Sequence, residues 1–272
     1  YARGDIPDAA REIFVLNSLA ESVTIIHPDA VAAGADDEEC VYNNVFLAGR
    51  SPNHISHFGG RLWIVNSLDN TLTFYDEDTL EEGGKIHLDR GSNPWQLVMN
   101  GEETIGYIPC YVSGTVLRID LSAYPDSSTE APEAEIFASD LALPEGAGLC
   151  QNTAGRELLF VVNSNNSAAA IGPGSLSVID TASGAVTAVD LEPAGFNPET
   201  DRGRNPQAVL VFPSLGEVHV VCTGDHPGSG HDSDDGEIVV VDIDSLAVTD
   251  RIAIGGSPNG FPAGVDPAGH RV

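Results

Sequence analysis

Short apolar runs recur along the chain, and each of them ends in Asn or Cys. They occupy residues 13–17, 62–66, 106–110, 159–163 and 218–222, so the starts lie 44 to 59 residues apart. Runs of this length, rich in β-branched and aromatic residues, predict buried strands rather than helices. Cys110 and Cys222 take the position that Asn holds in the other repeats, and we expect both to be buried free thiols.

Three further strand-like segments follow each first run. The second segments (23–27, 72–76, 116–120, 176–180 and 238–242) alternate, and four of the five end in Asp, which can turn a chain by bonding its own backbone. Third segments follow at 45–49, 85–89, 135–139, 185–191 and 247–254. A proline marks the fourth segments, at 51–54, 93–96, 143–146, 205–208 and 257–260. Four short antiparallel strands at a period near fifty, with almost no helical periodicity, predict the blades of an all-β propeller.

The best-formed repeat resembles a known family. Residues 160–186 contain FVVN and LSVIDTASGAV, and residues 205–218 read NPQAVLVFPSLGEV. Both resemble the YVTN repeat of bacterial and archaeal β-propellers, which include periplasmic and surface-layer proteins. The resemblance implies the fold and leaves the function open, because these propellers serve varied roles.

The repeats predict one propeller domain over residues 1–272 with about five blades, starting near 13, 62, 106, 159 and 218. The first unit lacks an inner strand of its own, since residues 1–10 are polar and irregular. Residues 258–265 read as an inner strand without a blade to follow. Two arrangements fit this pattern, a closed five-bladed ring and a fragment of a seven-bladed one.

Charge narrows the choice of partners. The chain has 41 acidic and 12 basic residues, for a formal net charge of -29. Such a surface repels nucleic acid and anionic membranes, and it suits high salt, where repulsion between carboxylates is screened. No apolar stretch is long enough for a transmembrane segment. Together with the resemblance, this predicts an extracytoplasmic protein that is periplasmic, secreted or on the cell surface.

One face of the propeller is expected to carry function. If the proline-marked strand is innermost, as in YVTN-like blades, its leading loop shares a face with the turn after the first run. These loops are lengthened at 164–174, 192–204 and 223–236, and long loops in a tight repeat often carry function. Arg50, Arg90, Arg202 and Arg204 precede the prolines. They either form a positive rim that holds a carboxylate or phosphate, or pair with acids such as Asp89 and Asp201.

The residues just after the prolines are expected to point toward the propeller axis. There they would form the floor of a small-ligand site, or hold ordered water between the strand ends. Together with the rim arginines and a neighbouring histidine, they give the candidate ligand-binding set: Arg50, Asn53, His54, Arg90, Trp95, Glu145, Arg204, Gln207 and Asn259.

A metal site is a separate candidate. The segment 225–237 holds the richest cluster of ligand-type side chains, including His226, His231, Asp232, Asp234 and Asp235. Alternating Asp suits calcium, although the EF-hand spacing is incomplete, and His with carboxylates suits zinc. A solvated acidic turn is the alternative.

The leading functional hypothesis is a non-catalytic binding or surface propeller that recognises a protein, a glycan or a small anion through this loop face. The sequence contains no GxSxG, HExxH or CxxCH motif. The alternative resembles the lactonase branch of seven-bladed propellers, a hydrolase or isomerase with Glu145 as general base and a rim arginine stabilising an oxyanion. It predicts a raised pKa for Glu145. A third hypothesis is a metal-binding propeller built on the segment 225–237.

Overall fold

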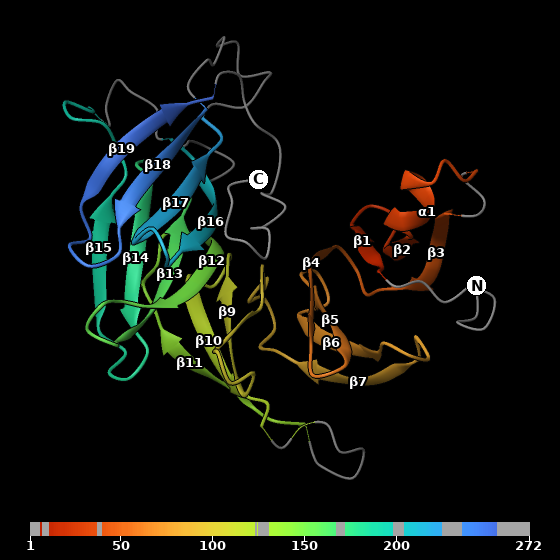
Figure 1. The fold of residues 1–272 in the computed structure, drawn as a ribbon. Helices are drawn as coiled ribbons and strands as arrows, with labels where there is room; N and C mark the ends of the chain where they lie inside the picture. The colour runs from red at the N-terminus through yellow and green to blue at the C-terminus, as the bar shows by residue number, and fades with distance from the viewer. Residues whose placement is uncertain are drawn as a thin grey trace. The chain divides into compact units, whose positions relative to one another are not determined.

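The computed structural model describes residues 6, 11–36, 40–122, 124, 131–166, 172–197, 204–224 and 236–254. This part of the chain contains nineteen strands and a single five-residue helix (Figure 1). It divides into two compact units. Unit 1 comprises residues 1–108 and 118–135, and unit 2 comprises residues 109–117 and 136–272.

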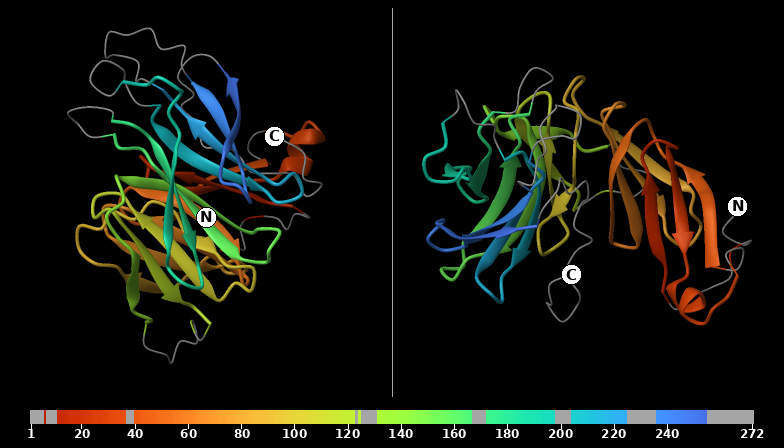
Figure 2. Two further views of the ribbon diagram at one scale, coloured as in Figure 1. Left: turned by 90° about the vertical axis from the view of Figure 1, so that its left-hand side faces the viewer. Right: turned by 90° about the horizontal axis from the view of Figure 1, so that it is seen from above.

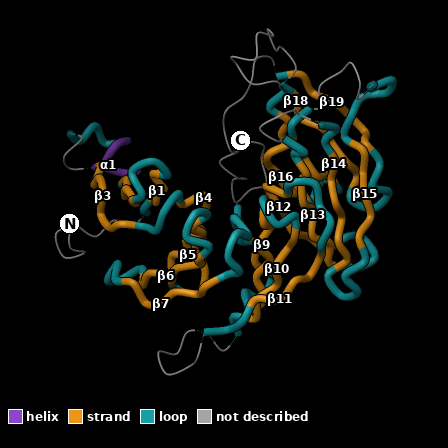
Figure 3. Tube along the Cα trace, turned by 180° about the vertical axis from the view of Figure 1, so that it is seen from behind, coloured by secondary structure: helices purple, strands orange, loops and turns teal. Residues whose placement is uncertain are grey.

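Two sheets lie entirely within unit 1. The first has three strands, β1 (Ile13–Asn17), β2 (Ser22–Ile26) and β3 (Val41–Leu47), and the helix α1 (Pro28–Ala32) connects β2 to β3 (Figure 3). The second has four strands, β4 (Pro52–Phe58), β5 (Arg61–Asn66), β6 (Thr71–Asp76) and β7 (Glu82–His87). The right view of Figure 2 shows these sheets side by side, with β1 next to β4.

The boundary between the units runs through the third sheet, which consists of β8 (Val98–Met99), β9 (Ile105–Cys110), β10 (Thr115–Asp120) and β11 (Ala134–Ala138). Unit 2 holds the last two sheets. One comprises β12 (Pro144–Gln151), β13 (Glu157–Asn163), β14 (Ser175–Asp180) and β15 (Val186–Asp190). The other comprises β16 (Pro206–Phe212), β17 (Glu217–Cys222), β18 (Glu237–Asp242) and β19 (Val248–Ala253).

Within each sheet the strands follow chain order, and the registered pairs are antiparallel. The proline-marked strands β4, β12 and β16 each form one edge of their sheet. The fold is therefore all-β, a β-propeller architecture of about five blades, as the repeat predicts. The first sheet has only three strands among the described residues, which agrees with the missing inner strand.

The cores lie between neighbouring sheets. In unit 2, alternate side chains of the two sheets meet in one apolar cluster that includes Phe160, Leu176, Val220 and Val239, all fully buried. In unit 1, a corresponding cluster joins residues such as Ile25 and Val45 to Leu62 and Ile64. The period-two alternation of the sequence thus places one face of each strand in a core.

The repeated Asn that ends the first run ties two strands together. The Asn66 amide donates to the hydroxyls of Thr71 and Thr73 at 3.2 and 3.1 Å, and it accepts from the Gly49 N–H at 3.0 Å. Asn163 likewise donates to Ser175 and Ser177. Buried polar groups need such partners. Cys110 and Cys222, at this repeat position, are buried, as predicted, and neither forms a disulfide with a described residue.

The Asp residues that end the second strands form the expected turns. The Asp180 carboxylate accepts the N–H and the hydroxyl of Ser183, both at 2.9 Å, and Asp242 does the same with Ser245 at 2.7 Å. Hydrogen bonds from these serine hydroxyls are the main reason that the pKa of each Asp is lowered. Both carboxylates are therefore ionised at neutral pH.

In the first repeat, the third strand was predicted to start at residue 45. This was wrong, because β3 begins at Val41. Two polar residues in its middle obscured the strand pattern. The Asn43 and Asn44 side chains accept hydrogen bonds from Thr24 and Ser22 on β2, and Asn44 takes a positive φ of 53° where the register shifts. The helix α1 was not predicted either, because a single turn is too short to show a helical period.

Candidate functional site

Three of the sheets have an end where the proline-marked strand begins and the next strand finishes. Pro52 pairs with Asn66, Pro144 with Asn163, and Pro206 with Cys222. The loop before each proline and the turn after the adjacent strand therefore lie together, as expected. We call this the proline end of a sheet.

In unit 2, the proline-marked strands of the two sheets lie against each other (Figure 1). A Cβ added to Gly146 on β12 would lie 2.5 Å from the Gln207 carbonyl oxygen and 2.7 Å from the Ala208 Cα on β16. Only glycine allows this approach. Glu145 and Gln207, predicted site residues of neighbouring blades, are thus placed close together by backbone contact.

Glu145 is the most unusual polar residue at this end. Its side chain is only 3% exposed, and its Oε2 atom has no hydrogen-bond partner among the described residues. Burial raises the pKa of Glu145 to about 7, although a hydrogen bond from Ser164 lowers it in part. A carboxyl group that titrates near neutral pH can exchange a proton with a bound molecule.

A serine and a tyrosine are near enough to this carboxyl to interact with it. The Ser164 hydroxyl also donates to the Leu143 carbonyl at 3.1 Å. Burial raises the pKa of Tyr111, and the negative charge of Glu145 raises it further; its hydroxyl donates to the Asn166 carbonyl. Glu145 therefore sits in a polar site with both a serine and a tyrosine at its edge.

Arg204 belongs to a second cluster at the proline end of unit 2. The Glu192 Oε1 atom accepts the N–H groups of Gly174 at 2.6 Å and Arg204 at 3.0 Å. The Arg204 side chain lies 3.5 Å from the Glu237 carboxylate, which also accepts from Arg251 at 2.6 Å. For Arg204 the structure thus matches the alternative that rim arginines pair with acids and hold the loops in place.

Burial is the main reason that the pKa of Glu192 is raised, and its Oε2 atom has no hydrogen-bond partner in the described part of the chain. Glu192 joins the loop before β14 to the loop before β16 through the two N–H groups it accepts. We interpret this residue as a support for the proline end, because its bonds go to backbone.

Five predicted site residues lie in unit 1. Arg50 and Arg90 have exposed side chains, and the Arg50 N–H donates to the Asp69 carboxylate at 2.8 Å. Desolvation lowers the pKa of His54 to about 4, so its ring is neutral at pH 7, where Nδ1 accepts the Leu97 N–H at 3.4 Å. Asn53 and Trp95 are half-buried.

The remaining predictions lie outside the described residues. These are the rim residue Arg202, Asn259 and the metal candidates His226, His231, Asp232, Asp234 and Asp235. Within the described part of the chain, no group of three or more His, Cys, Asp or Glu residues could hold a metal ion.

Sequence reasoning missed Ser164 and Tyr111 as neighbours of Glu145. The signal was present, since the residue after each first run bears a hydroxyl in all five repeats, at Ser18, Ser67, Tyr111, Ser164 and Thr223. Three of these hydroxyls donate to carbonyls of loops that precede proline-marked strands, on Pro94, Leu143 and Asn205. The residue that follows the first run therefore helps to hold the loops of the proline end together.

Comparison with known proteins supports the fold. The periplasmic gluconolactonase of Pseudomonas aeruginosa matches with a TM-score of 0.60 and 16% identity, over 92% of this chain and 69% of its own. A protein from Lactobacillus plantarum matches with a TM-score of 0.60 and 15% identity, over 93% and 71%. An auxiliary nutrient binding protein from Bacteroides ovatus matches with a TM-score of 0.54 and 11% identity, over 77% and 53%.

At these identities the similarity concerns the fold alone. No known protein family matches the sequence, and neither does any curated protein. Among the described residues, no helix is both long and apolar enough to cross a membrane. The chain is therefore similar in fold to β-propellers that include a gluconolactonase and a nutrient-binding protein.

Proposed function

We propose that this chain is a binding propeller that recognises a glycan through the proline end of unit 2. Buried Glu145, one of whose carboxylate oxygens has no partner among the residues that the structure describes, carries the proposal. Burying such a group costs stability unless a partner compensates for it. A ligand hydroxyl can donate to the unpartnered oxygen of Glu145, whereas an anionic ligand would be repelled once Glu145 ionises. Among protein, glycan and small anion, the glycan fits this carboxyl best.

We further propose that the described sheets belong to one propeller domain of the YVTN-repeat type, and that the protein works outside the cytoplasm. The repeat pattern and the charge of -29 support this. Two proteins of similar fold are a periplasmic enzyme and a nutrient-binding protein. Cell fractionation with an antibody against the protein tests the location, and recovery in the cytoplasmic fraction would contradict it.

Calorimetry with a panel of neutral sugars tests the binding proposal. The panel comprises D-glucose, D-galactose, D-mannose and their β-linked disaccharides. We expect at least one of them to bind, and Glu145→Gln to weaken it about tenfold, the effect of losing one hydrogen bond to a charged group. Asp250→Asn, at an exposed position in the middle of β19 and outside the loops of the proline end, should not change the affinity. Failure of every sugar to bind would refute the glycan assignment.

Lactone hydrolysis is the second candidate, and the pKa of Glu145 near 7 favours it. In its ionised form this carboxylate could take a proton from a water molecule that attacks a lactone carbonyl. The P. aeruginosa protein of similar fold is a gluconolactonase, so glucono-1,5-lactone is the first substrate to assay. The enzyme-dependent rate should rise with pH through about 7 and disappear in Glu145→Gln. A rate equal to spontaneous hydrolysis would exclude this substrate.

A further inference from the structure

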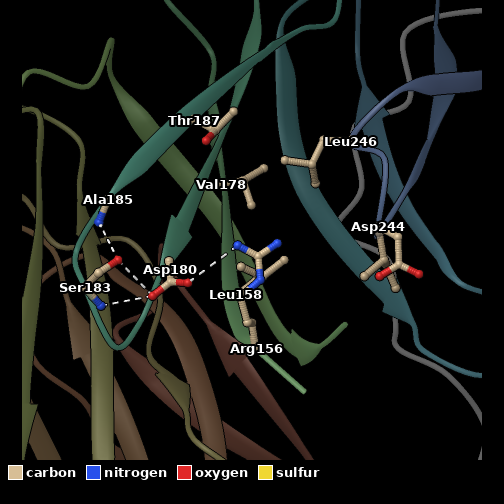
Figure 4. Close-up of a pocket in the computed structure, with 10 residues that line it drawn as sticks. Arg156, Leu158, Val178, Asp180, Ser183, Ala185, Thr187, Asp244 and Leu246 are labelled. Atoms are coloured by element: carbon tan, nitrogen blue, oxygen red, sulfur yellow. Dashed lines mark hydrogen bonds and ion pairs between the residues drawn. The ribbon is translucent and has the colours of Figure 1, made fainter. Parts of the chain in front are cut away.

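A pocket of about 160 Å³ lies at the end of the unit 2 sheets opposite the proline end. It opens where β13 and β15 begin and where β14 and β18 finish, so residues from both sheets form its wall (Figure 4). Its lining combines apolar residues with a few charged and hydroxyl side chains. The ones that carry the argument are Leu158, Val178, Ile243, Arg156, Asp180 and Asp244.

The floor of the pocket continues the hydrophobic core between the two sheets. Leu158, Val178 and Ile243 are at most 4% exposed and belong to that core, and Leu246 packs against it. The small exposed fraction that each of them keeps forms part of the pocket lining. A cavity of about 150 Å³ with apolar walls can hold a molecule as large as benzene. The pocket is therefore large enough for one branched aliphatic side chain.

A cation and an anion face each other at the rim. The Arg156 guanidinium is exposed, and its ion pair with Asp180 spans 3.9 Å, the outer limit of such a contact. Most of its five N–H donors therefore remain able to bind a carboxylate in the forked geometry that arginine favours. Figure 4 shows the two groups joined by a dashed line, with Leu158 and Val178 beside them.

A second anion comes from the other sheet. Asp244 follows β18, and its carboxylate is fixed by the N–H of Thr153 at 3.0 Å and by the Thr153 hydroxyl at 2.8 Å. On Asp180, the turn residues use Oδ1, and in the described part of the chain Oδ2 is paired with Arg156. Both aspartates can still accept hydrogen bonds from an ammonium group.

We propose that this pocket binds a free α-amino acid with a branched aliphatic side chain. The carboxylate pairs with Arg156, the ammonium group lies between Asp180 and Asp244, and the side chain covers Leu158, Val178 and Ile243. A simple carboxylic acid fits less well, because it would face two aspartates without a positive charge. A metal ion fits less well too, because the described residues offer no group of three ligands here.

Methyl NMR on the full chain tests this proposal, with L-leucine as the probe. We expect saturable shifts of the Leu158, Val178, Ile243 and Leu246 methyl signals. The analogues 4-methylpentanoate, which lacks the ammonium group, and 3-methylbutylamine, which lacks the carboxylate, should each bind at least about tenfold more weakly, since each loses a charge-assisted contact.

Arg156→Gln should weaken L-leucine binding by a similar factor, and so should Asp244→Asn. The matched control is Arg118→Gln, which removes another arginine with an acidic partner, Glu135, outside the pocket. It should leave the affinity unchanged. The proposal is overturned if about 50 mM L-leucine moves none of the four methyl signals, if the singly charged analogues bind as well as L-leucine, or if both arginine variants have the same effect.

Discussion

The free energy of unfolding should depend on the protonation of Glu145. Its pKa rises from the usual 4.5 to about 7 in the folded protein, which corresponds to about 3 kcal/mol. Below pH 4.5 the group is protonated in both the folded and the unfolded chain, so it has no effect. As the pH rises to 7, the unfolded chain loses the proton first and stability falls. Above pH 7 the full penalty is present.

Replacing Glu145 with Gln removes this penalty. We expect Glu145→Gln and the wild type to be equally stable at pH 4, and the variant to be more stable by about 3 kcal/mol at pH 8. Urea unfolding followed by far-ultraviolet circular dichroism at several pH values measures the difference. Tryptophan fluorescence is unsuitable, because Trp63 and Trp95 both lie in unit 1.

Both proteins contain every other titratable group, including Glu192. The effects of those groups therefore cancel in the difference between the two free energies of unfolding. Asp140→Asn serves as the control, since an exposed carboxylate should change stability little at any pH. A stability difference that stays constant from pH 4 to pH 8 would refute the reasoning, because it would mean that Glu145 is solvated or paired. A difference that grows with pH would show that the chain keeps a carboxyl group that destabilises it, as binding and catalytic sites often do.

Three further predictions concern the fold and the charge. Asn66→Ala removes three hydrogen bonds of a buried side chain and should lower the free energy of unfolding by about 3 kcal/mol. Asn17 is half-buried, so Asn17→Ala should lower it by only about 1 kcal/mol. Equal losses in urea titrations of the two variants would contradict this argument. Gly146→Ala should destabilise unit 2 by at least about 2 kcal/mol, because its Cβ would collide with the β16 backbone, whereas Gly101→Ala has open space and should be tolerated. With a net charge of -29, the melting temperature should rise from low salt to molar KCl as repulsion is screened; a constant value would exclude this effect.

Local signals in the sequence determined the repeat. Period-two alternation, the Asp at the end of the second strands and the prolines act over a few residues, so they predicted the sheets and their order. The role of the Asn that ends the first run could also be inferred from the sequence, because its partners lie on the next strand of the same hairpin. Polar Asn43 and Asn44 obscured the start of β3, where side-chain bonds to β2 replace an apolar pattern.

Only the tertiary structure decided the chemistry of the sites. Glu145 was a candidate by its place after a proline, but its burial depends on a segment that is distant in the chain, since β12 packs against β16. The opposite pocket likewise joins Arg156 to Asp244, which are far apart in sequence. Desolvation and pairing of charges depend on which atoms are near in space. A repeat pattern fixes the position of a residue within its blade, whereas the neighbouring blade determines how deeply that residue is buried.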